Sequence, residues 1–275
     1  MPAKTIPVTT RNNWFQRAEV IQRNRKKRWE HRQFLVEGVR AINQLRHNPR
    51  WQVEALLYNP AQRLSGWAQD VLGEIPCNYH LELTGELLAA LSDKEETSEV
   101  LAIVHMPTID EIPVQMGEKS VVVLLDRPSN PGNLGSIIRS CDAFGVDHVV
   151  LTGHGADPFD PVTVRATAGA FFNVPLARLS GNEALGRWFT DCRAQVPALQ
   201  IIGTSAQGEL PLIACDFTGP TILCMGNETR GLSSWLKEQC DALAYMHMQG
   251  VASSLNLACA TTAVLFEIGR QRGKV

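Results

Sequence analysis

The sequence contains no long hydrophobic segment. No apolar run approaches the roughly 20 residues that a membrane-spanning helix needs, and the first residues, MPAKTIPVTTRNNW, lack the apolar part of a signal peptide. We therefore expect a cytoplasmic protein that is neither exported nor membrane-bound. Low-complexity tracts are also absent, and 44% hydrophobic with 20% charged residues over 275 positions is typical of a globular chain with one or two domains.

Paired cysteines are absent as well. The seven cysteines are an odd number, and none of them forms a CxxC pair or lies in a Cys/His cluster with the spacing of metal ligands. This pattern favours reduced thiols and a protein without a structural zinc ion or any other metal.

Two common nucleotide-binding signatures are also missing. No GxGxxG follows the apolar segment 121–125, and no acidic residue ends the next predicted strand, which argues against a Rossmann dehydrogenase or a Rossmann-type methyltransferase. The absence of GxxxxGK[ST] argues against a phosphate-loop NTPase.

Positive charge, by contrast, is concentrated in the first 50 residues. The net charge is −2, but the first 50 residues contain twelve Lys and Arg against three Glu, a balance of +9 that leaves −11 for the other 225 residues. A basic end is typical of a chain that binds a polyanion, because Lys and Arg contacts to phosphate release counterions. The alternative is a solvated helix face. We predict that Arg25, Lys26, Lys27 and Arg28 bind the phosphates of a nucleic acid.

The chain pattern predicts two α/β domains. In the first half, helices are expected at 13–30 and 39–47, with a strand at 32–38 between them. Residues 107–120, with two prolines and several charges, form the expected linker. We place the boundary near residue 115, which gives an N-terminal domain over 1–115 and a C-terminal domain over 116–275.

In the second half, short apolar runs alternate with helices, a pattern that predicts a parallel sheet covered on both faces. Ligands bind such sheets at the carboxyl ends of the strands. Three loops there are rich in polar residues: DRPSNPGNLGSIIR, MGNETRGLS and QGVASSLN. In any one loop, the polar residues could simply form a turn or cap a helix, as Asn133, Glu228 and Ser254 could. The presence of three such loops in one sheet favours a shared pocket.

These loops resemble the motifs of the SpoU/TrmH branch of the SPOUT RNA methyltransferases. NPGNLGSIIRSCDAFG, LCMGNETRGLS and GVASSLNLACATTAVLFE occur in the family's order within residues 121–270, and the combination is specific. RKKRWEHRQFLVEGVRAI also looks like the small N-terminal substrate-binding domain of many members, in agreement with the charge distribution. The third motif departs from the family at His247, where proline is common.

The resemblance implies a fold and an activity. The fold would be a C-terminal SPOUT domain with a parallel sheet and a trefoil knot, preceded by a small α/β substrate-binding domain. The chain would form a homodimer through the knotted domain, and the partner could complete the active site. The reaction would transfer a methyl group from S-adenosylmethionine to a ribose 2′-hydroxyl of RNA. Ribosomal RNA is favoured over transfer RNA because an added basic domain extends the phosphate contacts. The alternatives are a tRNA 2′-O-methyltransferase, methylation of a base atom, and a non-catalytic RNA-binding protein that keeps the fold.

The resemblance also implies roles for individual residues. Arg139 would act on the hydroxyl, either as its base or, because a guanidinium pKa exceeds about 12, as a charge that stabilises a phosphate or an alkoxide. Asn133 would position Arg139 by hydrogen bonding, and Glu228, Ser254 and Asn256 would shape the catalytic pocket.

Further residues would bind the cofactor, largely through the backbone: Gly203, Thr204, Met225, Gly226, Asn227, Gly231, Met246 and Leu255. Arg165 is another candidate contact for an RNA phosphate, with a purely structural role as the alternative.

Overall fold

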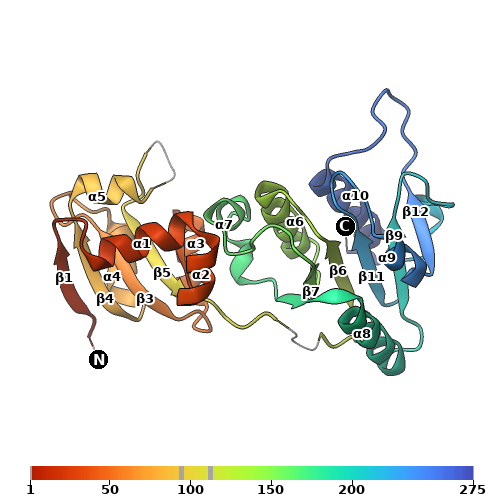
Figure 1. Ribbon diagram of the computed structural model, residues 1–275, viewed down its shortest axis with the longest axis horizontal. Helices are drawn as coiled ribbons and strands as arrows, with labels where there is room; N and C mark the ends of the chain where they lie inside the picture. The colour runs from red at the N-terminus through yellow and green to blue at the C-terminus, as the bar shows by residue number, and fades with distance from the viewer. Residues whose placement is uncertain (1, 93–95, 111–113, 275) are drawn as a thin grey trace. The chain divides into compact units, whose positions relative to one another are not determined.

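The computed structural model describes residues 2–92, 96–110 and 114–274, and the chain folds into two compact units (Figure 1). The first unit contains residues 1–107 and 157–173, and the second contains residues 108–156 and 174–275. We call residues 157–173 the strap. The boundary between the units follows Pro107 rather than residue 115, and the sequence does not predict the strap. The expected linker includes 111–113, which lie outside the described residues.

The first unit is built on a five-stranded mixed sheet with the strand order β1-β4-β3-β5-β2. β1, β4 and β3 run parallel, whereas β5 runs antiparallel to both of its neighbours, β3 and β2. The sequence pattern does not predict β1, whose Pro7 suits an edge strand because proline lacks the N–H that a central strand needs. The strands are β1 Lys4–Val8, β2 Gln33–Glu37, β3 Val53–Tyr58, β4 Cys77–Leu83 and β5 Val100–His105.

Asparagine side chains begin the first two helices. The Asn12 side chain accepts hydrogen bonds from the backbone N–H groups of Trp14 and Phe15, and the Asn24 side chain accepts one from Lys27. Asn24 itself is extended, so the single helix predicted over 13–30 is divided in two at this residue. The helices of the first unit are α1 Asn13–Arg23, α2 Arg25–His31, α3 Val39–His47, α4 Gly66–Glu74, α5 Gly85–Ala90 and, in the strap, α7 Pro161–Ala166 with the short 3₁₀ helix η1 Ala170–Phe172.

The strap completes the hydrophobic core of the first unit. Phe34 of β2 lies with its ring centre 5.1 Å from that of Phe159 and 5.7 Å from that of Phe171, both of which belong to the strap. Trp51 joins the same cluster, 5.5 Å from Phe171 and 5.0 Å from Phe172. The three strap phenylalanines are almost fully buried. Residues 1–107 therefore lack part of their own core without the strap.

The second unit contains a seven-stranded parallel sheet with the strand order β10-β12-β9-β11-β6-β7-β8. This confirms the predicted parallel sheet, although the sequence pattern does not predict β8 and β10. Central strands such as Val121–Asp126 are buried along their whole length, as expected for a sheet covered on both faces. The strands are β6 Val121–Asp126, β7 His148–Thr152, β8 Leu176–Leu179, β9 Gln200–Thr204, β10 Leu210–Pro211, β11 Thr221–Met225 and β12 Ala242–Tyr245.

Helices lie on both sides of this sheet (Figure 1). Trp188 and Phe189 of α8 pack with Leu236 of α9 against one face. α6 and α10 pack against each other, with a hydrogen bond of 2.7 Å between the Ser140 and Thr262 hydroxyls. The last helix, α10, begins at Leu257, directly after the polar loop QGVASSLN. The helices are α6 Pro131–Ala143, α8 Gly181–Gln195, α9 Ser234–Gln239, α10 Leu257–Gln271 and the short 3₁₀ helix η2 Leu212–Ala214.

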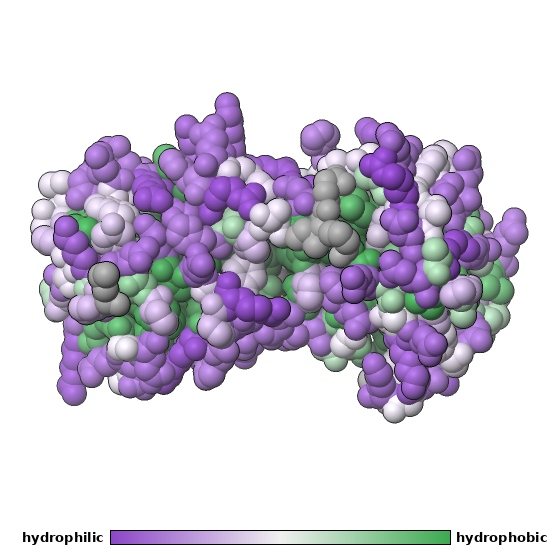
Figure 2. Space-filling model, turned by 90° about the horizontal axis from the view of Figure 1, so that it is seen from below, coloured by the Kyte–Doolittle hydropathy of each residue, from purple (hydrophilic) through white to green (hydrophobic). Residues whose placement is uncertain are grey.

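Most of the visible surface is hydrophilic, and hydrophobic residues form smaller patches between polar ones (Figure 2). Among the described residues, no helix is long and apolar enough to cross a bilayer.

Candidate functional site

The three polar loops of the second unit meet at one edge of its sheet. β6 and β11 are paired in parallel so that Leu125 lies beside Met225, and the loops that follow the two strands are therefore neighbours. Together with the loop between β12 and α10, they line a pocket of about 750 Å³. This volume is within the range of about 300 to 1,000 Å³ that is usual for small-molecule sites.

Glu228 is the centre of the polar contacts in this pocket. Its carboxylate accepts hydrogen bonds from the Ser129 N–H (3.0 Å), the Ser129 hydroxyl (2.7 Å) and the Asn130 N–H (3.1 Å). The Asn133 amide donates a further bond of 3.1 Å. Burial alone would raise the pKa of Glu228, but the bonds from Ser129 and Asn133 outweigh it and lower the pKa to about 2. Glu228 is therefore an anion at neutral pH and holds the first motif loop in place.

Asn133 connects Glu228 to the third motif. Its Nδ2 donates to Glu228, and its Oδ1 accepts a bond of 2.9 Å from Nδ2 of Asn256. The Asn256 Oδ1 accepts from the backbone N–H groups of Ala258 and Cys259 and so caps α10. The Asn256 side chain thus caps α10 and also takes part in the pocket.

The second motif loop is held by its own backbone and side chains. Asn227 and Gly231 exchange backbone hydrogen bonds of 3.1 and 2.9 Å, and Gly231 has a left-handed φ of 65°. A Cβ on Gly226 would lie 2.3 Å from the backbone of Gly231 and Leu232. Only glycine fits position 226, because the loop crosses over it too closely for a side chain.

Asp126 is a functional candidate that the sequence does not reveal. It is 4% exposed and accepts bonds from the Ser233 N–H (2.7 Å), the Thr152 hydroxyl (3.1 Å) and the guanidinium of Arg127 (2.7 and 2.8 Å). Burial raises its pKa, but the bonds from Arg127 and Ser233 outweigh this effect and lower it. Asp126 thereby joins the ends of β6 and β7 to the second motif loop. An acid directly after a fully apolar strand is the sequence signal that could have identified it.

Most predicted pocket residues line the pocket, with two exceptions. Asn133, Glu228, Ser254 and Asn256 lie there, together with Thr204, Met225, Gly226, Asn227, Gly231, Met246 and Leu255. Gly203 is not among the residues that line the pocket, and a Cβ on it would point toward Leu243, Cys240 and Leu232, each within 2.9 Å. The lack of a side chain at Gly203 lets β12 and the end of α9 pack closely on β9. The expected backbone contact of Gly203 with the cofactor stays a prediction.

Arg139 is the other exception. It is exposed on α6 and is not among the residues that line the pocket of a single chain. The expected hydrogen bond from Asn133 is absent in the described structure, because both polar atoms of the Asn133 amide are engaged by Glu228 and Asn256. Asn133 and Arg139 lie on one helix, where six residues correspond to about 9 Å along the axis and about 1.7 turns, so the two side chains point about 120° apart around the axis.

The chain matches the family model described as SpoU rRNA Methylase family over residues 120–266, and the model described as SpoU L30e-like domain over residues 12–102. The chain belongs to the SpoU rRNA methylase family. This confirms the family and the α/β fold class expected from the sequence, with the L30e-like match lying within the first unit. The trefoil knot stays a prediction.

Relatives of this SpoU family member cover nearly its whole length. The 23S rRNA (uridine(2479)-2'-O)-methyltransferase of Streptomyces viridochromogenes is 41% identical over 268 residues, which are 96% of this chain and 92% of the relative. The SpoU methyltransferase AviRb from the same organism, in complex with the cofactor AdoMet, has a TM-score of 0.89 at 40% identity, over 95% of this chain and 98% of that chain. The AdoMet-bound rRNA methyltransferase from Sinorhizobium meliloti has a TM-score of 0.85 at 30% identity, over 97% and 98%.

The basic residues of the SpoU chain's first unit fall into two groups. Arg25, Lys26 and Lys27 are exposed on α2, and Arg165 is exposed on α7. Lys26 and Lys27 both lie near Glu30, at 3.8 and 2.7 Å. Arg28, however, is 1% exposed and bound by two carboxylates. The assignment of Arg28 to RNA contact is therefore wrong, because its guanidinium cannot reach a phosphate.

Proposed function

We propose that this SpoU family member transfers a methyl group from S-adenosylmethionine to a ribose 2′-hydroxyl of 23S ribosomal RNA. The observation that carries the proposal is the pocket in which Glu228, Asn133 and Asn256 are joined by hydrogen bonds at the carboxyl edge of the parallel sheet. The full-length similarity to enzymes named as 23S rRNA 2′-O-methyltransferases supports the choice of ribose and of ribosomal RNA.

The pocket fits the cofactor in size and chemistry. Its wall combines apolar side chains, among them Leu212, Leu257 and Val264, with the polar strand-end loops. Such a lining suits a ligand that has a flat base, a ribose and a charged amino-acid end. S-adenosylmethionine, when bound, supplies an electrophilic methyl group on a sulfonium. The residues that would hold it lie on the strand-end loops: Thr204, Met225, Gly226, Asn227, Gly231, Met246 and Leu255.

The polar chain of Glu228, Asn133 and Asn256 orients the pocket rather than moving protons. With a pKa of about 2, Glu228 is too weak a base to accept the proton of a ribose hydroxyl at neutral pH. Its negative charge fixes Ser129 and Asn130 at the start of α6. Ser254 lines the same pocket. These groups would hold the ribose in line with the methyl group.

Arg139 would act on the 2′-hydroxyl, as its base or as the positive charge beside the developing alkoxide. It adjoins Ser140, which is bonded to Thr262 on α10. On α10, Phe266 is 52% exposed and Cys259 is also exposed, and Leu255, two residues before the helix begins, is 44% exposed. We propose that this face of α6 and α10 is the homodimer interface, and that Arg139 acts in an active site to which two chains contribute.

The exposed residues of α2 would recruit the RNA. Arg25, Lys26 and Lys27 present three cations from the first turn of α2 and suit the phosphate backbone of a folded RNA. Arg165 is a further candidate on the strap. The cytoplasmic location expected from the sequence stays a prediction.

The test is a map of 2′-O-methyl positions across total RNA from cells with and without the protein. We expect one position in 23S rRNA to lose its methyl group without the protein and to regain it when purified protein and S-adenosylmethionine are added. A change confined to tRNA, or a methyl group on a base atom, would contradict the proposal. An unchanged map would favour the non-catalytic alternative.

A further inference from the structure

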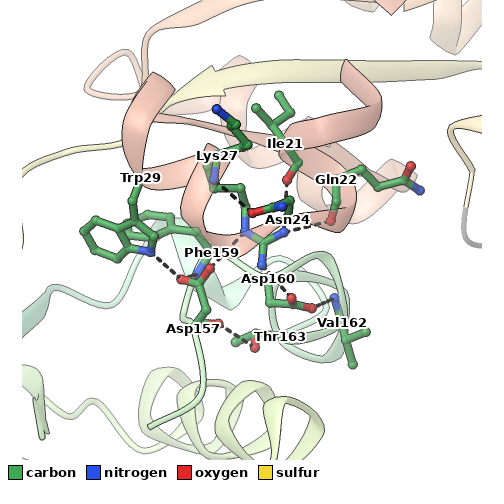
Figure 3. Close-up of polar contacts among 11 residues, drawn as sticks. Ile21, Gln22, Asn24, Lys27, Trp29, Asp157, Phe159, Asp160, Val162 and Thr163 are labelled. Carbon is green, nitrogen blue, oxygen red and sulfur yellow. Dashed lines mark hydrogen bonds and ion pairs between the residues drawn. The ribbon is translucent and has the colours of Figure 1, made fainter. Parts of the chain in front are cut away.

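Arg28 lies in the most basic part of the chain but faces inward. Its Nε donates to Asp157 at 2.9 Å, its Nη2 donates to Asp160 at 2.7 Å, and its Nη1 donates to the carbonyl oxygens of Ile21 and Gln22 at 3.0 and 2.7 Å (Figure 3). Both carboxylates belong to the strap. A buried guanidinium bonded on every side holds its partners in one geometry, because a lost partner would leave a buried charge without compensation.

The strap is built to receive this guanidinium. Asp157 also accepts bonds from the Trp29 indole (3.3 Å) and from the Phe159 N–H (3.1 Å), and Asp160 begins α7 by accepting from the Val162 N–H (Figure 3). Asp157 is 4% exposed, so its carboxylate is as deeply buried as its partner. The start of the strap is therefore fixed to α2 by charge and to β2 by the packing of Phe159 on Phe34.

The residues directly before the strap contact the backbone of the first motif loop. The Ala156 N–H donates to the Pro128 carbonyl at 2.6 Å, and a Cβ on Gly155 would lie 2.6 Å from the same oxygen. Pro128 precedes Ser129, which donates two hydrogen bonds to Glu228. One peptide bond thus separates Asp157, bound by Arg28, from Ala156, bound to the loop that positions the pocket.

We propose that Arg28 and Asp157 are positioning residues for catalysis, and that they set the geometry of the loop at 127–133 through Gly155 and Ala156. The basic helix α2 then has two functions. Its exposed residues bind RNA, and its buried arginine anchors the segment that supports the methyl-transfer site. Displacement of reacting groups by about 1 Å can cost about 100-fold in rate, so a small release of this anchor affects turnover. This inference rests on the proposed function.

The test measures turnover and RNA binding separately, with the full chain and 23S rRNA from cells that lack the protein. Asp157→Asn keeps the shape of the side chain and removes its charge, and Arg28→Lys keeps the charge and removes the planar fork. For both variants we expect kcat at saturating RNA to fall by at least about tenfold, while the RNA Kd and its salt dependence stay within about twofold.

Two other variants serve as comparisons, one for the loss of any ion pair and one for the loss of an RNA contact. Arg46 pairs with Glu74 on the surface of the same unit, so Arg46→Gln breaks an exposed ion pair and is expected to leave both kcat and Kd unchanged. Lys26→Gln removes an exposed cation of α2 and is expected to raise the RNA Kd with little change in kcat. The inverse pattern in Arg28→Lys, a raised Kd with normal kcat, would identify Arg28 as an RNA contact and overturn the inference.

Thermal denaturation of each variant serves as the control for correct folding, and the kinetics are measured well below the Tm of that variant. Should Asp157→Asn fail to fold, Trp29→Phe removes the 3.3 Å bond to Asp157, keeps an aromatic ring beside Phe159, and is expected to lower kcat by a smaller factor. A normal kcat in a folded Asp157→Asn or Trp29→Phe protein would refute the positioning role. Wild-type protein without methyl transfer would instead refute the proposed function, so the two failures are distinguishable.

Discussion

The two polar clusters of this protein differ in access to solvent. Around Glu228, side chains from three loops meet at an open pocket, and several of their polar atoms face solvent. Around Arg28, two carboxylates and two carbonyl groups enclose a guanidinium that is 1% exposed. A solvent-accessible cluster still has donors and acceptors that can bind a ligand. In a buried cluster, the donors and acceptors are already hydrogen-bonded within the protein.

The difference in exposure distinguishes residues that can bind a ligand from residues that stabilise the structure. Lys27 and Arg28 are neighbours in sequence and both are basic, yet one is exposed and the other is buried. Charge alone therefore does not identify an RNA contact. What distinguishes the two is the partner: Lys27 pairs with Glu30 one turn away, and Arg28 with carboxylates more than 120 residues away.

The largest expected effect is the loss of the folded state when the buried cluster is removed. Deletion of residues 1–107 would expose Phe159, Phe171 and Phe172 of the strap, each worth about 1.5 to 3 kcal/mol of burial. We expect this truncated protein to aggregate, as judged by light scattering. A second truncation, in which a Gly/Ser linker also replaces the strap, should stay soluble and bind S-adenosylhomocysteine in calorimetry with chelator present.

If the second, soluble truncation does not bind S-adenosylhomocysteine at millimolar concentration, this would contradict a cofactor site contained in the second unit. A soluble and well-folded simple deletion would show that the strap does not depend on the first unit.

Arg139→Ala should produce the next largest effect, a loss of about 100-fold or more in turnover, because a base or a stabilising charge is removed from the transition state. Cofactor affinity and Tm should be unchanged, since Arg139 is exposed and does not line the pocket of its own chain. Single-turnover methylation of 23S rRNA gives the rate.

Arg139→Lys distinguishes the two roles of this residue. Substantial activity in the lysine variant favours a simple charge, and no activity favours the planar guanidinium or a base. Near-normal methylation by Arg139→Ala would leave Arg139 as a structural residue.

Glu228→Gln tests whether the solvent-accessible cluster depends on charge. The new amide would point a donor at the donors of Ser129 or Asn133, so we expect turnover to fall by about tenfold. Because the pKa of about 2 lies below the usual value, Glu228 stabilises the fold above pH 4 and loses this contribution as the pH falls toward 2.

The difference in Tm between the wild type and Glu228→Gln should therefore be largest near pH 7 and shrink at pH 3. A constant difference across this range, or a step in the kcat profile between pH 5 and 9 that vanishes in Glu228→Gln, would argue against the lowered pKa.

The smallest effect is expected from single exposed cations of α2. Lys26→Gln should reduce the slope of log K against log salt by about 0.7 to 0.9 and weaken RNA binding a few-fold, because one phosphate contact is lost. Filter binding at several salt concentrations measures the slope, with Arg46→Gln as the control. An unchanged slope would place the RNA on another surface of the protein.

The sequence by itself determined the pattern of strands, the three loops and the family. Short apolar runs predict parallel strands because such strands are buried on both faces, and the loops after them meet at one edge for the same topological reason. Most predicted pocket residues, Glu228, Asn133 and Asn256 among them, lie in the pocket for this reason.

Only the tertiary structure decided which polar residues are accessible to a ligand and which are buried among partners in the protein. Arg28 is taken by Asp157 and Asp160 across a separation of about 130 residues, and no local periodicity records such a contact. The strap belongs to the second domain by sequence but to the first unit by packing, because its phenylalanines fill the core beside Phe34. Asn133 bonds Glu228 and Asn256 rather than Arg139, since the helix that carries both residues turns Arg139 away.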